Sequence, residues 1–139
     1  MNQIEDYIIV KNTISKEICQ SLVEENNKKE WRKHTWNNYT TGENTSESTK
    51  ELDVMNCTRG QQDKITPALI DALAQYQDIC SWEGEKTGSQ WLSKFSPIRF
   101  NKYEVGTMMR RHYDHIHSIF DGKMKGVPIV SIVGNLNED

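Results

Sequence analysis

Long apolar runs are missing from this 139-residue sequence. A helix that crosses a membrane needs about 20 mostly apolar residues, and no run approaches that length. Hydrophobic residues make up only 35% of the chain, and its mean hydropathy is −0.77. These values argue against a membrane partner, and they predict either a very polar surface or a core that lacks some strands.

Cysteine is also scarce. Cys19, Cys57 and Cys80 lie far apart, with no C-x-x-C pair and no cysteine–histidine cluster. This spacing argues against a zinc-finger type of site, and an odd, sparse set is not a disulfide framework. Because no apolar segment follows Met1, we expect no secretory leader and a reducing, cytoplasmic location.

A strong excess of either charge is absent as well. The formal net charge is −3, which provides no general attraction to nucleic acid or to anionic membranes. At 139 residues the chain is one domain's worth and long enough to bury a core. We therefore expect a single domain over residues 1–139, in which any charged binding surface is local.

The chain begins with a short strand and a helix. Tyr7–Val10 is apolar and predicts the strand, and Thr13 or Ser15 can cap the helix that follows. Apolar residues recur every four positions along that helix: Ile14, Ile18 and Leu22. Glu24–Glu30 is polar and predicts the solvated end of the helix.

An extended segment and a loop come next. Glu30–Trp36 predicts a strand in which Trp31 and Trp36 are partly buried, with a place beside a substrate groove as the alternative for one of them. His34 has no partner at metal-binding spacing, which predicts a surface histidine. Asn37–Lys50 is rich in Asn, Thr, Ser and Gly and predicts a loop.

A further strand and a second helix complete the expected scaffold. Leu52–Asn56 alternates as a strand that ends at Arg59 and Gly60. Thr66 and Pro67 predict the start of the helix, since proline is favoured in a first turn. The buried face of this helix is expected to comprise Leu69, Ile70, Leu73 and Tyr76.

The second half of the chain carries the candidate chemistry. The alternation of Met108–Asp114 predicts a strand after a bend at Gly106, so His112 and Asp114 point the same way. A neutral imidazole and a carboxylate side by side form half of a site for Fe(II), which two histidines and one carboxylate bind on one face. The sequence therefore predicts His112 and Asp114 as metal ligands.

Other interpretations of these residues remain open. An H-x-D triplet also arises by chance, as a half-buried histidine oriented by a carboxylate. In a helix, His112 and His115 would be neighbours and could form a zinc site, but no H-E-x-x-H motif is present. We expect His115 and His117 to lie after the strand, near the mouth of the site, rather than to bind the metal.

The residues around the triplet resemble a known family. The pattern is Y-x-x-G-x5-H-x-D, and its fixed positions are Tyr103, Gly106, His112 and Asp114. An apolar run, Val127–Leu136, follows it. The pattern resembles the first metal-binding strand of the prolyl 4-hydroxylase-like branch of the Fe(II)/2-oxoglutarate-dependent dioxygenases, and is most similar to short members that marine bacterial viruses (phages) encode. The resemblance covers Ile98–Asp139.

The resemblance implies an α+β fold with a double-stranded β-helix (jelly-roll) core. This core would be incomplete at the C-terminus, with N-terminal helices packed on one sheet. Residues 1–97 would be the scaffold of helices and strands, and residues 98–139 the first metal-binding strands, including one that starts at Pro128. Beside the metal ligands His112 and Asp114, the resemblance implies Tyr103 and Asn135 as residues that bind 2-oxoglutarate.

The implied activity is Fe(II)- and 2-oxoglutarate-dependent hydroxylation in the cytoplasm, or in the host cytoplasm for a viral protein. Dioxygen is the second co-substrate and ascorbate an accessory reductant, and 2-oxoglutarate is converted to succinate and carbon dioxide. The leading substrate class is a prolyl or other side chain of a peptide or protein. No catalytic residue beyond the metal ligands is implied.

The family pattern also requires a second ligand histidine and then an arginine or lysine that pairs with 2-oxoglutarate. Both would lie several dozen residues after the H-x-D, beyond Asp139. We expect the N-terminal two-thirds of an enzyme: a truncated reading frame, a deliberately shortened chain, or a product that another chain completes. Such a chain alone would be inactive and could associate through unpaired strand edges.

Two other functions stay open. Nucleic-acid and nucleotide oxidative demethylases share the H-x-D, but they usually show a basic binding face, which the overall acidity disfavours. The other alternative is an inactive fragment that serves as a binding module. Binding of single-stranded oligonucleotides would favour the first, and failure to bind metal would favour the second.

Overall fold

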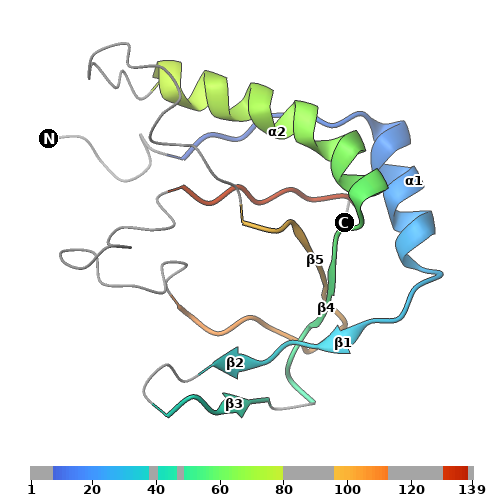
Figure 1. Cartoon of the computed structure of the whole chain (residues 1–139), viewed down its shortest axis with the longest axis vertical. Helices are drawn as coiled ribbons and strands as arrows, with labels where there is room; N and C mark the ends of the chain where they lie inside the picture. The colour runs from blue at the N-terminus through green and yellow to red at the C-terminus, as the bar shows by residue number, and fades with distance from the viewer. Residues whose placement is uncertain (1–7, 38–40, 47–48, 80–95, 113–129, 138–139) are drawn as a thin grey trace, which may run out of the picture. The chain divides into compact units, whose positions relative to one another are not determined.

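The computed structural model describes residues 8–37, 41–46, 49–79, 96–112 and 130–137 of the chain. They form an α+β arrangement, as predicted, without showing a double-stranded β-helix. In chain order the elements are α1 (Lys16–Asn26), β1 (Arg32–Lys33), β2 (Trp36–Asn37), β3 (Asn44–Thr45), β4 (Asp53–Asn56), α2 (Arg59–Ile79) and β5 (Arg99–Lys102) (Figure 1). One sheet has the strand order β1-β4-β5, and the other pairs β2 with β3.

The chain divides into two compact units that interleave along the sequence. The helical unit comprises Met1–Glu30, Met55–Phe100 and Leu136–Asp139, and the strand unit comprises Trp31–Val54 and Asn101–Asn135. Helices α1 and α2 belong to the first unit, and β1, β2 and β3 belong to the second. All the candidate site residues that the structure describes lie in the strand unit.

Helix α1 follows from local signals. The Ser15 hydroxyl accepts a hydrogen bond from the Ile18 N–H at 3.4 Å, so Ser15 is the cap. Leu22 of the predicted apolar stripe is fully buried. The helix ends at Asn26, whose side chain is also buried. Glu24, Asn27 and Lys28 are exposed, as predicted for a solvated end, and Asn26 is the buried exception among them.

Helix α2 begins at Arg59, so the predicted start at Thr66 and Pro67 is wrong. Thr58 and Gln61 form a capping box: Gln61 Oε1 accepts from the Thr58 N–H at 3.1 Å, and Thr58 Oγ1 accepts from the Gln61 N–H at 3.4 Å. Pro67 lies inside the helix at a cost of about 3 kcal/mol relative to alanine. The cap and the buried contacts of the first turns offset that cost.

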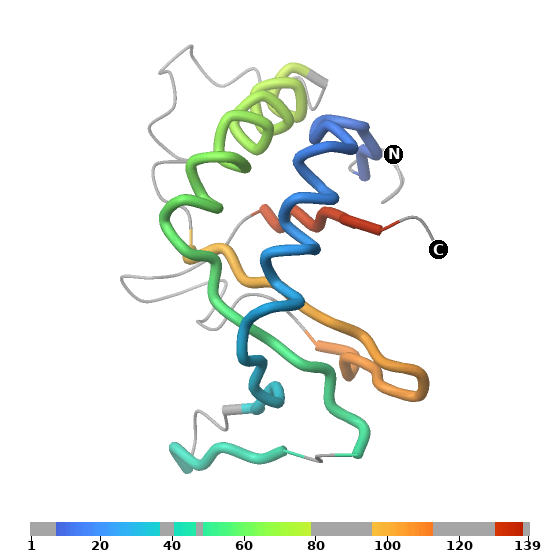
Figure 2. The backbone as a smooth tube through the Cα atoms, turned by 90° about the vertical axis from the view of Figure 1, so that its right-hand side faces the viewer, coloured from blue at the N-terminus to red at the C-terminus, as the bar shows by residue number. Residues whose placement is uncertain are grey.

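Helices α1 and α2 lie beside each other in the helical unit (Figure 2). Gln61 Nε2 donates to Asn26 Oδ1 at 2.6 Å, and both side chains are buried. At the surface the Lys64 ammonium pairs with Glu25. The buried apolar side chains of this unit are Leu22, Met55, Cys57, Ile65 and Phe100. Of the predicted α2 face, Leu69, Leu73 and Tyr76 are half-buried, whereas Ile70 is exposed.

Several strand predictions differ from the structure. No strand forms in the described parts of three predicted ones, residues 8–10, 108–112 and 130–137. Ile8, Val10 and Val133 expose most of their side-chain surface, so apolar composition alone did not bury these segments. Conversely, the predicted loop after Trp36 contains the β2–β3 hairpin, in which Trp36 faces Thr45. Among the described residues, no helix is both long and apolar enough to cross a membrane.

Within the strand unit, β1 pairs with the first two residues of β4, Asp53 and Val54. These strands are antiparallel, with Arg32 opposite Val54. Leu52 and Val54 are buried, as predicted, but Met55 is buried as well and Asn56 is exposed, so burial does not alternate along β4. Strand β5 covers the centre of the predicted strand Ile98–Val105. The bend at Gly106 is confirmed: this residue has φ 84°, and the Thr107 N–H donates to the Glu104 carbonyl at 2.9 Å.

Candidate functional site

The strand unit contains a buried carboxylate, that of Glu51, which is only 1% exposed. Its Oε1 accepts a hydrogen bond from Trp36 Nε1 at 2.9 Å and one from Arg110 Nη2 at 3.4 Å. Its Oε2 lies 3.6 Å from His34 Nδ1. With His112, which contacts Trp36, these residues form what we call the Glu51 cluster: His34, Trp36, Glu51, Arg110 and His112.

Backbone contacts bring these distant residues together. The His34 N–H donates to the Leu52 carbonyl at 2.9 Å, which continues the β1–β4 pairing and places His34 beside residue 51. The Ser46 hydroxyl donates to the His34 carbonyl at 3.1 Å. On the other side, the Met108 N–H donates to the Lys50 carbonyl at 3.0 Å. That bond attaches the segment carrying Arg110 and His112 next to Glu51.

His112 is exposed, and two of its ring contacts define its orientation. Its Nδ1 lies 2.6 Å from the Arg110 carbonyl oxygen. Because a carbonyl oxygen only accepts, Nδ1 carries the hydrogen, and in the neutral imidazole the lone pair is on Nε2. The Trp36 ring meets the His112 ring in an edge arrangement, with centroids 5.2 Å apart. This orientation is the usual one for a histidine that binds metal through Nε2.

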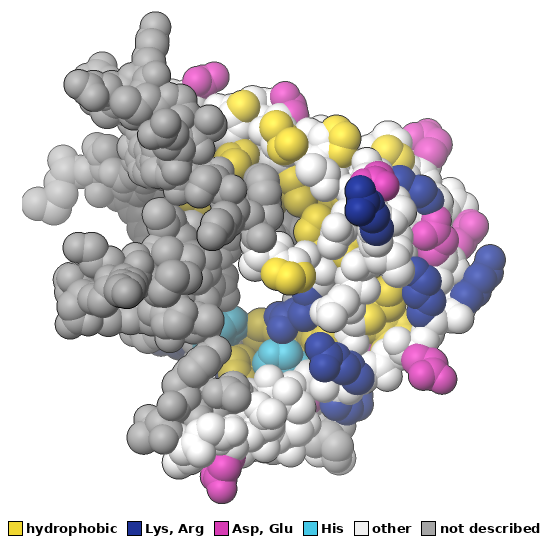
Figure 3. All heavy atoms as spheres, viewed as in Figure 1, with side chains coloured by type: hydrophobic (Ala, Val, Ile, Leu, Met, Phe, Trp, Pro, Cys, Tyr) yellow, Lys and Arg dark blue, Asp and Glu magenta, His cyan; other side chains and the backbone are white. Residues whose placement is uncertain are grey.

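Trp36 is the centre of the aromatic contacts. It meets His34 edge-on at 4.6 Å as well as His112, and the Arg110 guanidinium carbon lies 5.7 Å from its ring centroid. Such a cation–π contact adds to the charge-assisted hydrogen bond between Arg110 and Glu51. Histidine side chains lie next to Lys and Arg side chains on the face shown in Figure 3. The cluster therefore combines the buried negative charge of Glu51 with the exposed side chains of Arg110 and His112.

The predicted site residues that the structure describes are exposed but are not joined to one another. His112, Tyr103 and Asn135 all lie in the strand unit with exposed side chains. No hydrogen bond links Tyr103 or Asn135 to His112 within the described ranges. Asp114, His115 and His117 lie outside the described residues. The assignments of Asp114 and of the two later histidines therefore stay predictions.

Two predictions about the aromatic segment have opposite outcomes. Trp31 and Trp36 are both partly buried, as predicted. The prediction of a surface His34 is wrong, because this side chain is only 7% exposed. Its backbone pairing with Leu52 carries it inward, and the Glu51 carboxylate provides a polar neighbour there.

Sequence reasoning missed Glu51 and Arg110. Neither residue is singled out by the sequence patterns described above. The one local signal is that Glu51 directly precedes the apolar positions of a strand, where an acidic residue is unusual unless it is paired. Glu51 and Arg110 are 59 residues apart, so no spacing pattern connects them.

The donor chemistry at His112 fits the implied metal. An imidazole Nε2 with its Nδ1–H anchored on a carbonyl is a suitable ligand for Fe(II), and a carboxylate at position 114 would be a suitable second ligand. In the part of the chain that is described, no group of three or more His, Cys, Asp or Glu side chains could hold a metal ion. Of the two predicted ligands, only His112 has described surroundings, because Asp114 lies outside the described residues.

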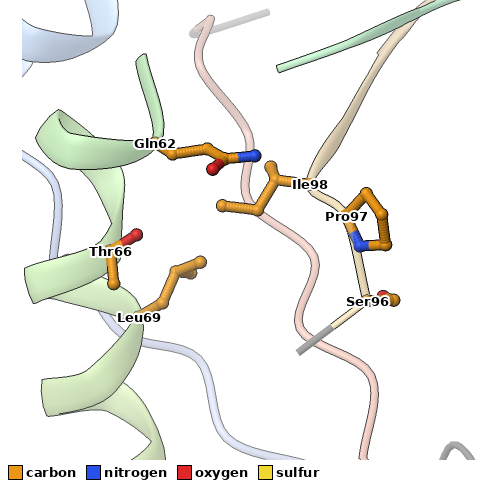
Figure 4. Close-up of a pocket in the computed structure, with 6 residues that line it drawn as sticks. All are labelled: Gln62, Thr66, Leu69, Ser96, Pro97 and Ile98. Atoms are coloured by element: carbon orange, nitrogen blue, oxygen red, sulfur yellow. The ribbon is translucent and has the colours of Figure 1, made fainter. Parts of the chain in front are cut away.

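A hollow in the helical unit differs in character from the Glu51 cluster. It encloses about 300 Å³ between α2 and the segment that leads into β5 (Figure 4). It is lined by Gln62, Thr66, Leu69, Ser96, Pro97 and Ile98. None of these lining side chains is charged or able to bind metal strongly. The hollow therefore offers no chemistry comparable to that of the Glu51 cluster.

No protein-family model, no curated protein and no solved structure matches this chain.

Proposed function

We propose that the complete protein is an Fe(II)- and 2-oxoglutarate-dependent dioxygenase that hydroxylates a side chain of a peptide or protein, with a prolyl side chain as the leading candidate. His112 and Asp114 are the metal ligands that this sequence carries. The pattern Y-x-x-G-x5-H-x-D supports this proposal at the level of sequence. A jelly-roll core is part of the same proposal.

The observation that carries the proposal is the orientation of His112. Its Nδ1–H donates to the Arg110 carbonyl at 2.6 Å, so Nε2 has the lone pair that a metal ligand requires. A histidine serving only as a surface residue has no need of a fixed tautomer. The exposure of the ring also leaves it accessible to an ion from solvent.

Tyr103 and Asn135 are proposed to bind and orient 2-oxoglutarate. The Tyr103 hydroxyl would donate a hydrogen bond to a carboxylate of 2-oxoglutarate, and its side chain is 55% exposed and thus accessible. Asn135, which is also exposed, would line the same pocket with its amide. When bound, the iron supplies the oxidative chemistry. The protein binds, orients and shields the reactants.

A pair of carboxylate variants tests the ligand assignment. Asp114→Ala should strongly weaken binding of Mn(II), a stand-in for Fe(II), as measured by paramagnetic broadening of the His112 ring signals. Asp121→Ala is the matched control, because it removes a carboxylate from the same stretch of sequence, and binding should be unchanged. Equal loss in both variants, or loss in neither, would mean that the assignment is wrong.

Catalysis is tested with the same pair of variants in the complete protein. Asp114→Ala should abolish the metal-dependent conversion of 2-oxoglutarate to succinate, and Asp121→Ala should not.

A further inference from the structure

The Glu51 carboxylate connects to the His112 imidazole by two separate routes. Along the first, Glu51 Oε1 accepts from Trp36 Nε1 at 2.9 Å, and the Trp36 ring packs against the His112 ring at 5.2 Å. Along the second, the same oxygen accepts from Arg110 Nη2 at 3.4 Å, and the Arg110 carbonyl accepts from His112 Nδ1 at 2.6 Å. Trp36 and Arg110, which both contact the imidazole, are thus held by one buried oxygen.

Burying the Glu51 carboxylate is costly. We therefore expect this residue to have a role that an apolar residue could not fill. Taking a carboxylate out of water costs several kcal/mol, and a buried ion pair can often be replaced by apolar residues without loss of stability. At 1% exposure Glu51 is among the most buried side chains described, yet its Arg110 partner is about half exposed. A purely structural role therefore explains its position poorly. Holding two polar partners in a fixed geometry explains it better.

We infer that Glu51 is a positioning residue for the His112 imidazole, which it orients through Trp36 and Arg110 so that Nε2 faces the metal. This inference rests on the proposed function, and it assigns Glu51 no contact with the metal or the substrate. Loss of the carboxylate charge weakens the hydrogen bonds by which Glu51 holds the Arg110 side chain and the Trp36 indole. The Arg110 carbonyl and the aromatic edge then fix the imidazole less firmly.

The test uses the apo form of the full 139-residue chain. Long-range ¹H–¹⁵N spectra of the histidine rings report which ring nitrogen carries the hydrogen, and mildly alkaline conditions keep imidazoles neutral. We expect the wild-type His112 signals of an Nδ1–H tautomer. Glu51→Gln should move both ring nitrogens toward the shifts of a mixture of tautomers. The matched control is Glu104→Gln, since Glu104 is an exposed glutamate of the same unit that pairs with Lys102.

Metal titration separates this inference from the proposed function. If both hold, Mn(II) affinity at His112 falls about 10-fold or more in Glu51→Gln and is unchanged in Glu104→Gln. If the tautomer changes in Glu51→Gln while the wild-type chain binds no metal at His112, Glu51 positions the ring and the proposed function fails. If Glu51→Gln keeps both the tautomer and the wild-type affinity, the inference is overturned and the proposed function stands.

A second variant keeps the test decisive if Glu51→Gln does not fold. Trp36→Phe removes the indole N–H that binds Glu51 but retains an aromatic ring beside His112. We expect the same change of tautomer, smaller in size because the Arg110 route remains. An unchanged tautomer in folded Trp36→Phe would overturn the Trp36 route, and with it the two-route inference.

Discussion

The two units of this chain bury different kinds of side chain. Five buried apolar residues belong to the helical unit, and Leu52 and Val54 are the buried apolar residues of the strand unit, counting only the described residues. The buried polar residues also differ between the two units. The helical unit buries two neutral amides, Asn26 and Gln61, whereas the strand unit buries an ionisable pair, His34 and Glu51.

This difference separates residues that hold the fold from residues suited to chemistry. The amide pair satisfies itself through one short hydrogen bond, so its burial costs little. A carboxylate beside histidine, arginine and indole groups is costly to desolvate, and it connects to an exposed histidine. Local rules of stability are usually broken where function requires it. The strand unit is therefore where a functional site is expected.

The largest effect should come from the apolar core of the helical unit. Leu22→Ala removes a fully buried side chain and leaves a cavity, so the free energy of unfolding should fall by about 2–5 kcal/mol. Denaturant unfolding followed by circular dichroism measures it. Ile70→Ala is the control, because Ile70 is 53% exposed, and it should cost less than about 1 kcal/mol. Equal losses would mean that the described core does not hold this unit together.

An intermediate effect is expected from the buried charge of the strand unit. Glu51→Ala removes the carboxylate that accepts from the Trp36 N–H and from Arg110, so stability should fall by about 1–3 kcal/mol. Amide hydrogen exchange in β1 should speed up more than exchange in α1. Glu43→Ala, which removes an exposed glutamate of the same unit, is the control. The comparison between the units breaks down if α1 loses as much protection as β1.

The sequence was informative about the helical unit because its signals are local. A serine cap and a four-residue apolar spacing predicted α1, and both are found. The capping box of Thr58 and Gln61 is a local signal as well, but it was missed. The predicted start of α2 at Thr66 and Pro67 is therefore wrong, although proline is favoured in a first turn. The capping box and buried contacts outweigh the cost of a proline inside the helix.

The candidate site could be predicted only in part. His112 was found from the spacing of an H-x-D triplet and a surrounding pattern. Its neighbours could not be found in this way, because Trp36 and Glu51 are 15 residues apart and Glu51 and Arg110 are 59 apart. Contacts over such separations depend on the strand pairing and on single backbone bonds such as Met108 to Lys50. No periodicity in the sequence encodes them.

A pH-dependent effect should come from Cys57, in the helical unit. Burial raises the pKa of the Cys57 thiol, with the Lys29 charge opposing it. A raised thiol pKa favours the neutral form in the folded state. The resulting contribution to stability is complete below the pKa of the thiol in the unfolded chain. It is lost as pH rises through the pKa of the thiol in the folded protein. Unfolding free energy should therefore decline with alkaline pH, and Cys57→Ala should flatten that decline. An equal decline in both proteins would assign it to other groups.

The smallest effect should come from two exposed ion pairs, one taken from each unit. The Lys64 ammonium lowers the pKa of Glu25 in the helical unit, and the Glu104 carboxylate raises the pKa of Lys102 in the strand unit. The contribution of Glu25 to stability is thus present above the pKa of the carboxyl in the unfolded chain, and it is lost as pH falls through the pKa in the folded protein. The contribution of Lys102 to stability is instead lost as pH rises through the pKa of Lys102 in the folded protein. Glu25→Gln should therefore slightly lower the denaturant midpoint at neutral pH but not at strongly acidic pH. High salt should remove the difference, because exposed pairs are screened. A difference that persists in high salt would mean that Glu25 acts through packing between α1 and α2 rather than through its charge.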